Sequence, residues 1–195
     1  MTTVSNPLAE QLRTFHGKNV SVLTNGFDED DYHYEAMANK AGKFRIVYTG
    51  NIYRCKQDPS LLFRALKDLI SEGFIQKSEL EIDFYGRELN EAKRISHKMN
   101  MGENVYFPGM VSYKESIQKQ SEANILLLLE WADKRIKGVY TGKIFEYLGA
   151  RKPILAIGPK RGVVEKLLRE TGAGRLASDV HATKEILHSR MDYSF

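Results

Sequence analysis

The amino-acid sequence predicts an α/β protein, a Rossmann-like doubly wound parallel sheet with helices on both faces. Short apolar segments alternate with segments whose apolar residues recur at helical spacing, and this alternation is typical of a parallel sheet with helical crossovers. The segment Ala123–Leu129 is apolar apart from Asn124. A run of this kind suits a central strand that helices cover on both sides.

The first part of the sheet is expected between residues 42 and 109. Strands are predicted at Phe44–Thr49, Leu80–Tyr85 and Val105–Phe107, the last closed by Pro108-Gly109. A helix is expected to begin at Asp58, because aspartate caps helices and Pro59 suits the first helical position. Its buried face carries Leu62, Leu66, Leu69 and Ile70. The next helix is predicted by the spacing of Leu89, Ala92, Ile95 and Met99.

The second part of the sheet is expected after residue 112. Ser112 and Glu115 form a capping box, which predicts that a helix begins there. The expected strands are Ala123–Leu129, Pro153–Ile157 and a weak one near Arg175-Leu176. Helices are predicted from Lys143 and over Thr183–His188. Another helix is marked by Val163, Val164, Leu167 and Leu168 and ended by Thr171-Gly172.

The first 41 residues have a different pattern. A short helix is expected around Leu8, Leu12 and Phe15, and a short strand at Val20–Thr24. Residues 29–43 are polar and charged, which is typical of a linker. We therefore expect a remnant of a preceding domain with an interdomain linker at 1–41, and one full domain at 42–195.

The amino-acid composition favours some classes of protein and excludes others. The chain has 195 residues, of which 42% are hydrophobic and 28% charged, as in an ordinary globular domain. No apolar run approaches the roughly 20 residues that span a bilayer. The single cysteine, Cys55, excludes an intrachain disulfide, and the five histidines have no metal-ligand spacing. The net charge of +4 favours a mildly basic domain over a nucleic-acid-binding one, although the basic run at residues 134–137 is more specific.

The most informative segment runs from Gly138 to Ala156. It predicts a loop, a short helix and a buried strand, so that the N–H groups of Tyr140, Thr141 and Gly142 and the helix dipole form an anion site. On the helix, Ile144, Phe145 and Leu148 share one face, and Lys143, Glu146 and Ala150 share the other. A cation and a carboxylate beside a phosphate site suit a phosphorylated ligand with hydroxyls, such as a nucleotide-sugar.

Glycines end several of the predicted strands. They are Gly50, Gly86 and Gly109. Ligands of doubly wound sheets bind at the carboxyl ends of the strands, where glycine allows a close approach to the backbone. Each glycine by itself is better explained by a turn, but the set favours a binding site.

Four segments follow one another in a characteristic order and spacing: Val22–Asp28, Tyr48–Lys56, Phe107–Gly109 and Lys143–Pro153. They resemble the interdomain segment, the first strand with its phosphate loop, the base-holding loop and the ribose-binding helix of a GT-B glycosyltransferase of family 4, the group 1 type. The resemblance runs along nearly the whole chain and implies the C-terminal, donor-binding domain of such an enzyme.

The resemblance implies roles for particular residues. Gly50, Asn51 and Gly86 would lie against the donor, Met110 and Val111 would flank the base, and the backbone of Tyr140, Thr141 and Gly142 would hold phosphate beside Lys143. Glu146 would accept hydrogen bonds from the ribose hydroxyls, the alternative being an ion pair with Lys143. Lys56 falls at the family's lysine position, and Arg54 could supply the charge of the arginine that Asn51 replaces. We take these two cations as the catalytic pair; the alternative is that both are solvated loop residues.

The chain departs from the family at two points. Many members have a second glutamate eight positions before the ribose glutamate, and this chain has Gly138 there; Glu130 and Asp133 lie upstream, out of register. Most of the first, acceptor-binding domain is also missing. We therefore expect this chain alone to bind nucleotide weakly and to transfer little or no sugar, because transfer needs both substrates held between two domains.

The function expected from the resemblance is binding of a UDP- or GDP-linked sugar for retaining transfer to an acceptor, in cytoplasmic polysaccharide biosynthesis. No metal and no cofactor besides the donor are expected. The expected partners are the nucleotide-sugar and the missing N-terminal domain, with no nucleic acid; peripheral contact with the cytoplasmic face of a membrane is compatible with the family. The alternatives are a non-catalytic nucleotide-binding module and a GT-B-fold sugar-nucleotide epimerase.

Overall fold

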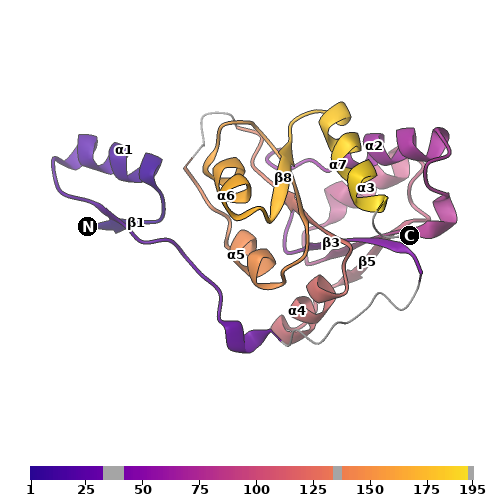
Figure 1. Ribbon diagram of the computed structural model, residues 1–195, viewed down its shortest axis with the longest axis horizontal. Helices are drawn as coiled ribbons and strands as arrows, with labels where there is room; N and C mark the ends of the chain where they lie inside the picture. Colours follow the sequence, from indigo (N-terminus) through magenta and orange to yellow (C-terminus); the bar gives the residue numbers. More distant parts are fainter. Residues whose placement is uncertain (33–41, 134–137, 193–195) are drawn as a thin grey trace.

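The computed structural model describes residues 1–32, 42–133 and 138–192, and it confirms the predicted fold class (Figure 1). A parallel sheet of six strands has the order β5-β4-β3-β6-β7-β8. Its strands are β3 (Phe44–Thr49), β4 (Leu80–Tyr85), β5 (Val105–Gly109), β6 (Ile125–Leu129), β7 (Ile154–Ile157) and β8 (Gly174–Ala177). The basic run at residues 134–137 lies outside the described residues.

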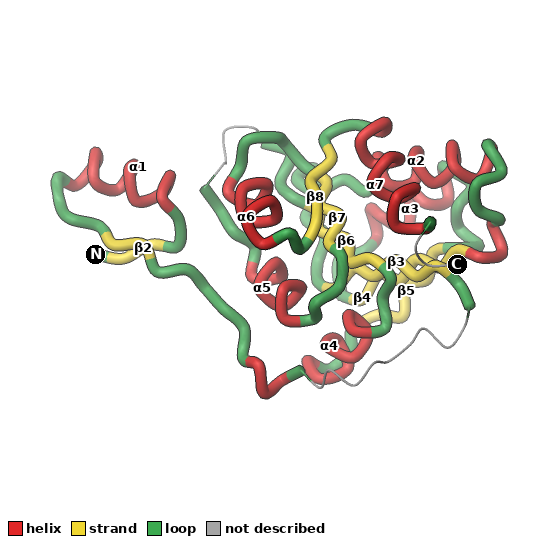
Figure 2. The backbone as a smooth tube through the Cα atoms, in the orientation of Figure 1, coloured by secondary structure: helices red, strands yellow, loops and turns green. Residues whose placement is uncertain are grey.

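Helices cover both faces of this sheet (Figure 2). One face carries α2 (Ser60–Ser71), α3 (Asn90–Lys98) and α7 (Val180–Met191); the other carries α4 (Tyr113–Ser121), α5 (Gly142–Gly149) and α6 (Val163–Thr171). A 3-10 helix, η2 (Lys77–Glu79), precedes β4. The buried strand β6 explains why its sequence is continuously apolar. Leu127 and Leu129 enter the core under α2, whereas Leu126 and Leu128 enter the core under α5.

The direction of strand addition reverses at β3. The chain runs from β3 through β4 to β5 at one edge, then returns to the other side of β3 and continues through β6, β7 and β8. The connections that follow β3 and β6 therefore leave on opposite faces of the sheet, which opens a crevice at the carboxyl ends of these two strands. Asn51 follows β3 and Glu130 follows β6, so both lie at this crevice.

The N-terminal residues form a small unit beside the main sheet (Figure 1). Strands β1 (Thr2–Thr3) and β2 (Ser21–Val22) pair in parallel, with α1 (Asn6–His16) between them and a 3-10 helix, η1 (Glu29–Asp31), further on. The predicted linker falls partly on 33–41, outside the described residues, so the boundary near residue 42 stays a prediction. Among the contacts of this unit with the main domain, the Ser5 hydroxyl donates to the Gly138 carbonyl at 2.5 Å, the Tyr32 hydroxyl donates to the Glu146 carbonyl at 2.9 Å, and the Tyr113 hydroxyl donates to the Asp31 carboxylate at 2.9 Å.

The capping box at the start of α4 is confirmed. The Glu115 N–H donates to the Ser112 hydroxyl at 3.3 Å, and the Ser112 N–H donates to the Glu115 carboxylate at 2.8 Å. The prediction for α2 is wrong by one position. Pro59 is its N-cap rather than its first helical residue, although the Asp58 carboxylate does accept the Ser60 N–H at 2.8 Å.

Several other expectations need correction. The strand expected at Val20–Thr24 contains only Ser21 and Val22. Ala150 was assigned to the polar face of α5, but the helix ends at Gly149 and Ala150, as its C-cap, is buried in the core. Within the described part of the chain, no helix has the length and hydropathy that a membrane span requires.

The ends of β3, β4 and β5 are held together through their glycines. The Gly50 N–H donates to the Tyr85 carbonyl at 2.7 Å, and the Gly86 N–H donates to the Gly109 carbonyl at 2.9 Å. Gly86 has a φ of +152°, and a Cβ at this position would lie 2.2 Å from the Gly50 carbonyl oxygen. Only glycine allows this approach, so the edge of the sheet depends on it.

We predict that Gly86→Ala lowers the free energy of unfolding by about 2–4 kcal/mol, because it combines backbone strain with a steric clash. Gly109→Ala is the matched control. Its φ of +91° imposes strain, but a Cβ there meets nothing within 4 Å, so we expect a loss of only about 1–2 kcal/mol. Urea unfolding of both variants measures the difference, and equal losses would contradict the close contact at Gly86.

Candidate functional site

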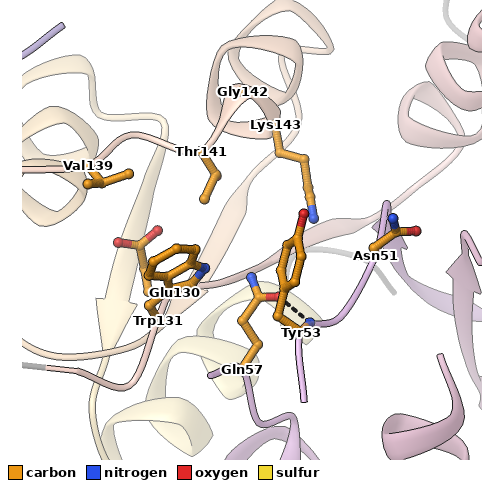
Figure 3. Close-up of a pocket in the computed structure, with 9 residues that line it drawn as sticks. All are labelled: Asn51, Tyr53, Gln57, Glu130, Trp131, Val139, Thr141, Gly142 and Lys143. Atoms are coloured by element: carbon orange, nitrogen blue, oxygen red, sulfur yellow. Dashed lines mark hydrogen bonds between the residues drawn. The ribbon is translucent and has the colours of Figure 1, made fainter. Parts of the chain in front are cut away.

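Two cavities meet at the carboxyl edge of the sheet. The first, of about 350 Å³, lies between the loops after β3 and β6 and the loop before α5 (Figure 3). It is lined by Asn51, Tyr53, Gln57, Glu130, Trp131, Val139, Thr141, Gly142 and Lys143. The second, of about 290 Å³, lies over the ends of β3, β4 and β5. Asn51 and Lys143 line both cavities, so the two form adjoining parts of one crevice.

The second cavity brings together most of the residues that the sequence assigned to a ligand. They come from β3, β4, β5, α5 and the loops that follow the strands: Gly50, Asn51, Gly86, Met110, Val111, Lys143 and Glu146. Thr141 and Gly142 line the first cavity instead. The Tyr140 side chain points elsewhere. Its ring packs edge-on against Phe145 at 5.5 Å and lines a separate cavity beside α6.

The two cations proposed as catalytic, Arg54 and Lys56, are exposed in the loop after β3, and neither is among the described residues that line the two cavities. The Lys56 ammonium lies 4.4 Å from the centroid of the Trp131 ring, in a cation–π contact. The Lys56 carbonyl accepts the Ala132 N–H at 2.7 Å, which ties this loop to the end of β6. Lys56 therefore supports the wall of the first cavity from outside.

Lys143 is the cation inside the crevice. Its ammonium donates to the Tyr48 hydroxyl at 2.8 Å and lies against Gly50, where a Cβ would come within 2.7 Å of it. Burial lowers the pKa of Lys143 to about 8, although the nearby Glu146 carboxylate acts in the opposite direction. Lys143 thus remains protonated at neutral pH. Within the described part of the chain, it bonds to Tyr48 rather than forming the ion pair with Glu146 that was the alternative.

Glu146 is held at the edge of the second cavity by its neighbours on α4. Its carboxylate accepts from the Gln120 amide at 3.3 Å, and Gln120 also donates to Thr49 and Ser116. The Tyr32 hydroxyl donates to the Glu146 carbonyl. Glu146 thus lines the same cavity as Gly86 and Met110, with a carboxylate that can accept hydrogen bonds from a ligand.

Tyr147 has a structural role that the sequence reasoning missed. Its side chain is fully buried, and its hydroxyl accepts the Thr49 N–H at 3.0 Å, which joins α5 to the end of β3. Burial raises the pKa of Tyr147 to about 12. The helical spacing of Ile144, Tyr147 and Leu148 could have indicated that Tyr147 faces the core.

Two residues that line the first cavity each have one buried polar atom without a hydrogen-bond partner among the described residues. The two atoms are Glu130 Oε1 and Thr141 Oγ1. Burial raises the pKa of Glu130 to about 7. Gln57, by contrast, has a partner for each amide atom: its N–H donates to the Leu129 carbonyl at 2.6 Å, and its oxygen accepts the Tyr53 N–H at 3.1 Å, the bond that Figure 3 marks. The sequence pointed to Glu130 only as a carboxylate out of register.

Gly138 lies against the N-terminal unit rather than in either cavity. A Cβ there would come within 3.1 Å of Leu8 and 3.2 Å of Pro7 and Ser5. Contacts this tight leave no room for a glutamate side chain unless the N-terminal unit shifts. Packing therefore explains the glycine at this position. Among the described residues, no group of three or more His, Cys, Asp or Glu side chains could hold a metal ion.

No family model and no curated protein matches this sequence. The fold, however, is similar to several solved structures. One is HepE of Anabaena in complex with UDP-glucose, with a TM-score of 0.74 and 15% identity over 99% of this chain and 54% of that one. Another is WaaG, a glycosyltransferase involved in lipopolysaccharide biosynthesis, with a TM-score of 0.73 and 13% identity over 98% of this chain and 53% of that one.

Sucrose-phosphate synthase from Thermosynechococcus elongatus is also similar, with a TM-score of 0.73 and 14% identity over 98% of this chain and 49% of that one. This chain spans about half the length of these three structures. At such low identities the likeness establishes the fold. The α/β fold is thus shared with glycosyltransferases, as the sequence predicted.

We predict that replacing the buried Lys143 ammonium stabilises the fold. The folded chain releases the Lys143 proton near pH 8 and the unfolded chain near 10.5, so the cost of burying the charge is greatest below pH 8 and falls as the pH rises toward 10.5. Lys143→Met should raise the free energy of unfolding at pH 7 by about 1 kcal/mol, after the loss of its own contacts. The Tyr48 hydroxyl keeps its bond to the Asn51 carbonyl. Urea unfolding at pH 7 checks this, and a less stable variant would contradict it.

We predict that the effect of Glu130 on the free energy of unfolding depends on pH in the opposite direction. The folded chain keeps this proton up to about pH 7 and the unfolded chain only to about 4.5, so the stability contributed by Glu130 is present below pH 4.5 and is lost as the pH rises through 7. Glu130→Gln should match the wild type at pH 4.5 and exceed it by about 1–3 kcal/mol at pH 8. Chemical unfolding at both values measures this, and a difference independent of pH would refute the assignment.

Proposed function

We propose that this chain is the C-terminal, donor-binding domain of a GT-B glycosyltransferase of family 4, the group 1 type, and that it binds a nucleotide-diphospho-sugar. One observation carries the proposal. Glycine backbone after β3 and β4 meets a cation and a carboxylate of α5 in one cavity, at the point where strand order reverses: Gly50, Gly86, Lys143 and Glu146. The similarity of the fold to glycosyltransferases supports it.

The nucleoside would occupy the second cavity. The Glu146 carboxylate can accept hydrogen bonds from both vicinal hydroxyls of a ribose, because it has two oxygens and is oriented by Gln120. The base would lie toward Met110 and Val111, whose backbone atoms follow β5. Uracil is the first base to test, since the similar HepE structures contain UDP-glucose and UDP.

The diphosphate would lie between the two cavities, against Lys143. Lys143 and Asn51 line both cavities, and the N–H groups at the start of α5 add partial positive charge at the same place. A protonated lysine and helix N–H groups stabilise the negative charge that develops on a leaving nucleoside diphosphate. Arg54 and Lys56 would act as a second, outer pair of cations on this leaving group.

Transfer requires more than this domain. The chain spans about half the length of the similar enzymes, and an acceptor must be held in line with the donor. We propose that a second domain provides the acceptor site and that transfer retains the configuration of the anomeric carbon. Nucleotide binding is therefore the activity by which this domain can be tested on its own.

We predict that UDP or GDP binds to this chain and that Glu146→Ala and Lys143→Met each weaken binding about 10- to 100-fold, because each removes hydrogen bonds that involve a charged group. Isothermal titration calorimetry measures the affinities. Lys56→Met should weaken binding less than Lys143→Met, since Lys56 lies outside the cavity.

Two exposed residues provide controls for these variants. Glu185→Ala on α7 and Lys98→Met on α3 remove the same charges from the far surface, and we expect unchanged affinity. Absence of binding for both nucleotides at millimolar concentration would refute the proposed function. An unchanged affinity in Glu146→Ala would refute the ribose assignment alone.

A further inference from the structure

Residues 28–32 lie outside both cavities, yet they contact the two helices that border the second one. The segment contains η1 and runs beside α4 (Figure 1). None of its residues is among the described residues that line either cavity. Any effect of this segment on a ligand in the crevice must therefore pass through α4 or α5.

Tyr32 is anchored in the core beside α5. Among residues 1–32 it alone is a buried member of this core, and only 5% of its surface is exposed. Its ring lies against Gly149, where a Cβ would come within 2.4 Å of Tyr32 Cζ. Its hydroxyl donates to the Glu146 carbonyl at 2.9 Å, an oxygen that also accepts the Ala150 N–H. Tyr32 thus holds the last turn of α5 in place.

Asp31, the residue before Tyr32, holds the other helix. Its carboxylate accepts from the Tyr113 hydroxyl at 2.9 Å, and Tyr113 is the first residue of α4 and lines the second cavity. The same helix carries Gln120, whose amide donates to the Glu146 carboxylate at 3.3 Å. Two consecutive residues therefore join α4 to α5 from outside the cavity, and the bond between Gln120 and Glu146 joins the same two helices beside it.

The orientation of α5 depends on contacts of this kind. The helix has only eight residues, which is too short for a helix to be stable by itself in water. Lys143 and Tyr147 attach it to β3, through Tyr48 and Thr49. Glu146 lies in its last turn, where Tyr32 attaches, so a rotation of this turn would move the Glu146 carboxylate.

We propose that Asp31 and Tyr32 are positioning residues of the proposed nucleoside site. By joining α4 to α5 they fix the direction of the Glu146 carboxylate, and recognition of the ribose hydroxyls depends on that direction. This inference rests on the proposed function, because it assumes that Glu146 binds ribose. A purely structural role has a different consequence: losing either contact would then lower the stability of the fold without changing how the site distinguishes ribose from deoxyribose.

Calorimetry with UDP and 2′-deoxy-UDP separates the two roles, or with GDP and 2′-deoxy-GDP if only guanosine nucleotides bind. The wild type should prefer UDP about tenfold, because the deoxy analogue lacks one hydrogen bond to a carboxylate. Tyr32→Phe and Asp31→Ala should each reduce this preference to about threefold or less, because a displaced carboxylate binds the 2′-hydroxyl less well. Glu146→Ala should abolish the preference, and adding Tyr32→Phe to that variant should change nothing further.

Two other variants control for indirect effects. Asp31→Asn keeps an oxygen that can accept from Tyr113, so it should retain the wild-type preference within about twofold. Ile186→Val removes one carbon from the core under α7, on the opposite face of the sheet, and so lowers stability without touching α4 or α5. Its preference should equal that of the wild type. Tyr32→Phe keeps the buried ring and Asp31 is exposed, so both test variants should fold.

The outcomes distinguish three failures. If UDP and GDP both fail to bind, the proposed function fails and this inference with it. If nucleotide binds without a preference for ribose, or if Glu146→Ala keeps that preference, the ribose assignment fails and the positioning role with it. If Glu146→Ala abolishes the preference while Tyr32→Phe and Asp31→Ala retain it, the positioning role alone is refuted. It is also refuted if Ile186→Val loses the preference as much as Tyr32→Phe does.

Discussion

The junction between the start of α5 and the end of β3 positions both cavities, and the Lys143 ammonium contacts Tyr48 and Gly50 across it. Tyr147 reinforces the same junction, because its hydroxyl accepts the Thr49 N–H. With these contacts the loop before α5 stands over the crevice at the reversal of strand order. The absence of a side chain at Gly50 leaves room for this contact, since a Cβ there would displace the ammonium.

Two ionisable side chains at the crevice, Lys143 and Glu130, are buried, and burial disfavours their charged forms. Burial lowers the pKa of Lys143 and raises that of Glu130, so both titrate much closer to neutral pH than in water. Neither arrangement helps the fold. Groups of this kind are common where a protein binds or converts a ligand, because the ligand supplies the missing charge or hydrogen bond. The arrangement of the two groups is thus easier to explain by binding than by stability.

The sequence allowed the fold class and most strands to be predicted, because buried parallel strands produce apolar runs and their turns require residues such as Gly86. The helical spacing of its apolar residues also placed Glu146 and Lys143 on one helix. The sequence could not distinguish Lys56 from Lys143 as the cation in the crevice, since both are lysines next to a loop and only tertiary packing buries one of them. The tight contacts of Gly138 with Pro7 and Leu8 join segments about 130 residues apart, which no local pattern reveals.

Strand β6 shows how a uniform sequence can still adopt one alignment. Its five residues are Ile125 and four leucines, so sliding the strand by one residue would exchange its faces without exposing anything polar. Hydrophobicity therefore cannot choose between the two alignments. The polar contacts at the ends can: the Asn124 side chain accepts the Arg45 N–H at 2.9 Å, and Gln57 donates to the Leu129 carbonyl at 2.6 Å. These two amides fix the alignment of β6. In this alignment, Glu130 faces the crevice instead of the opposite side of the sheet.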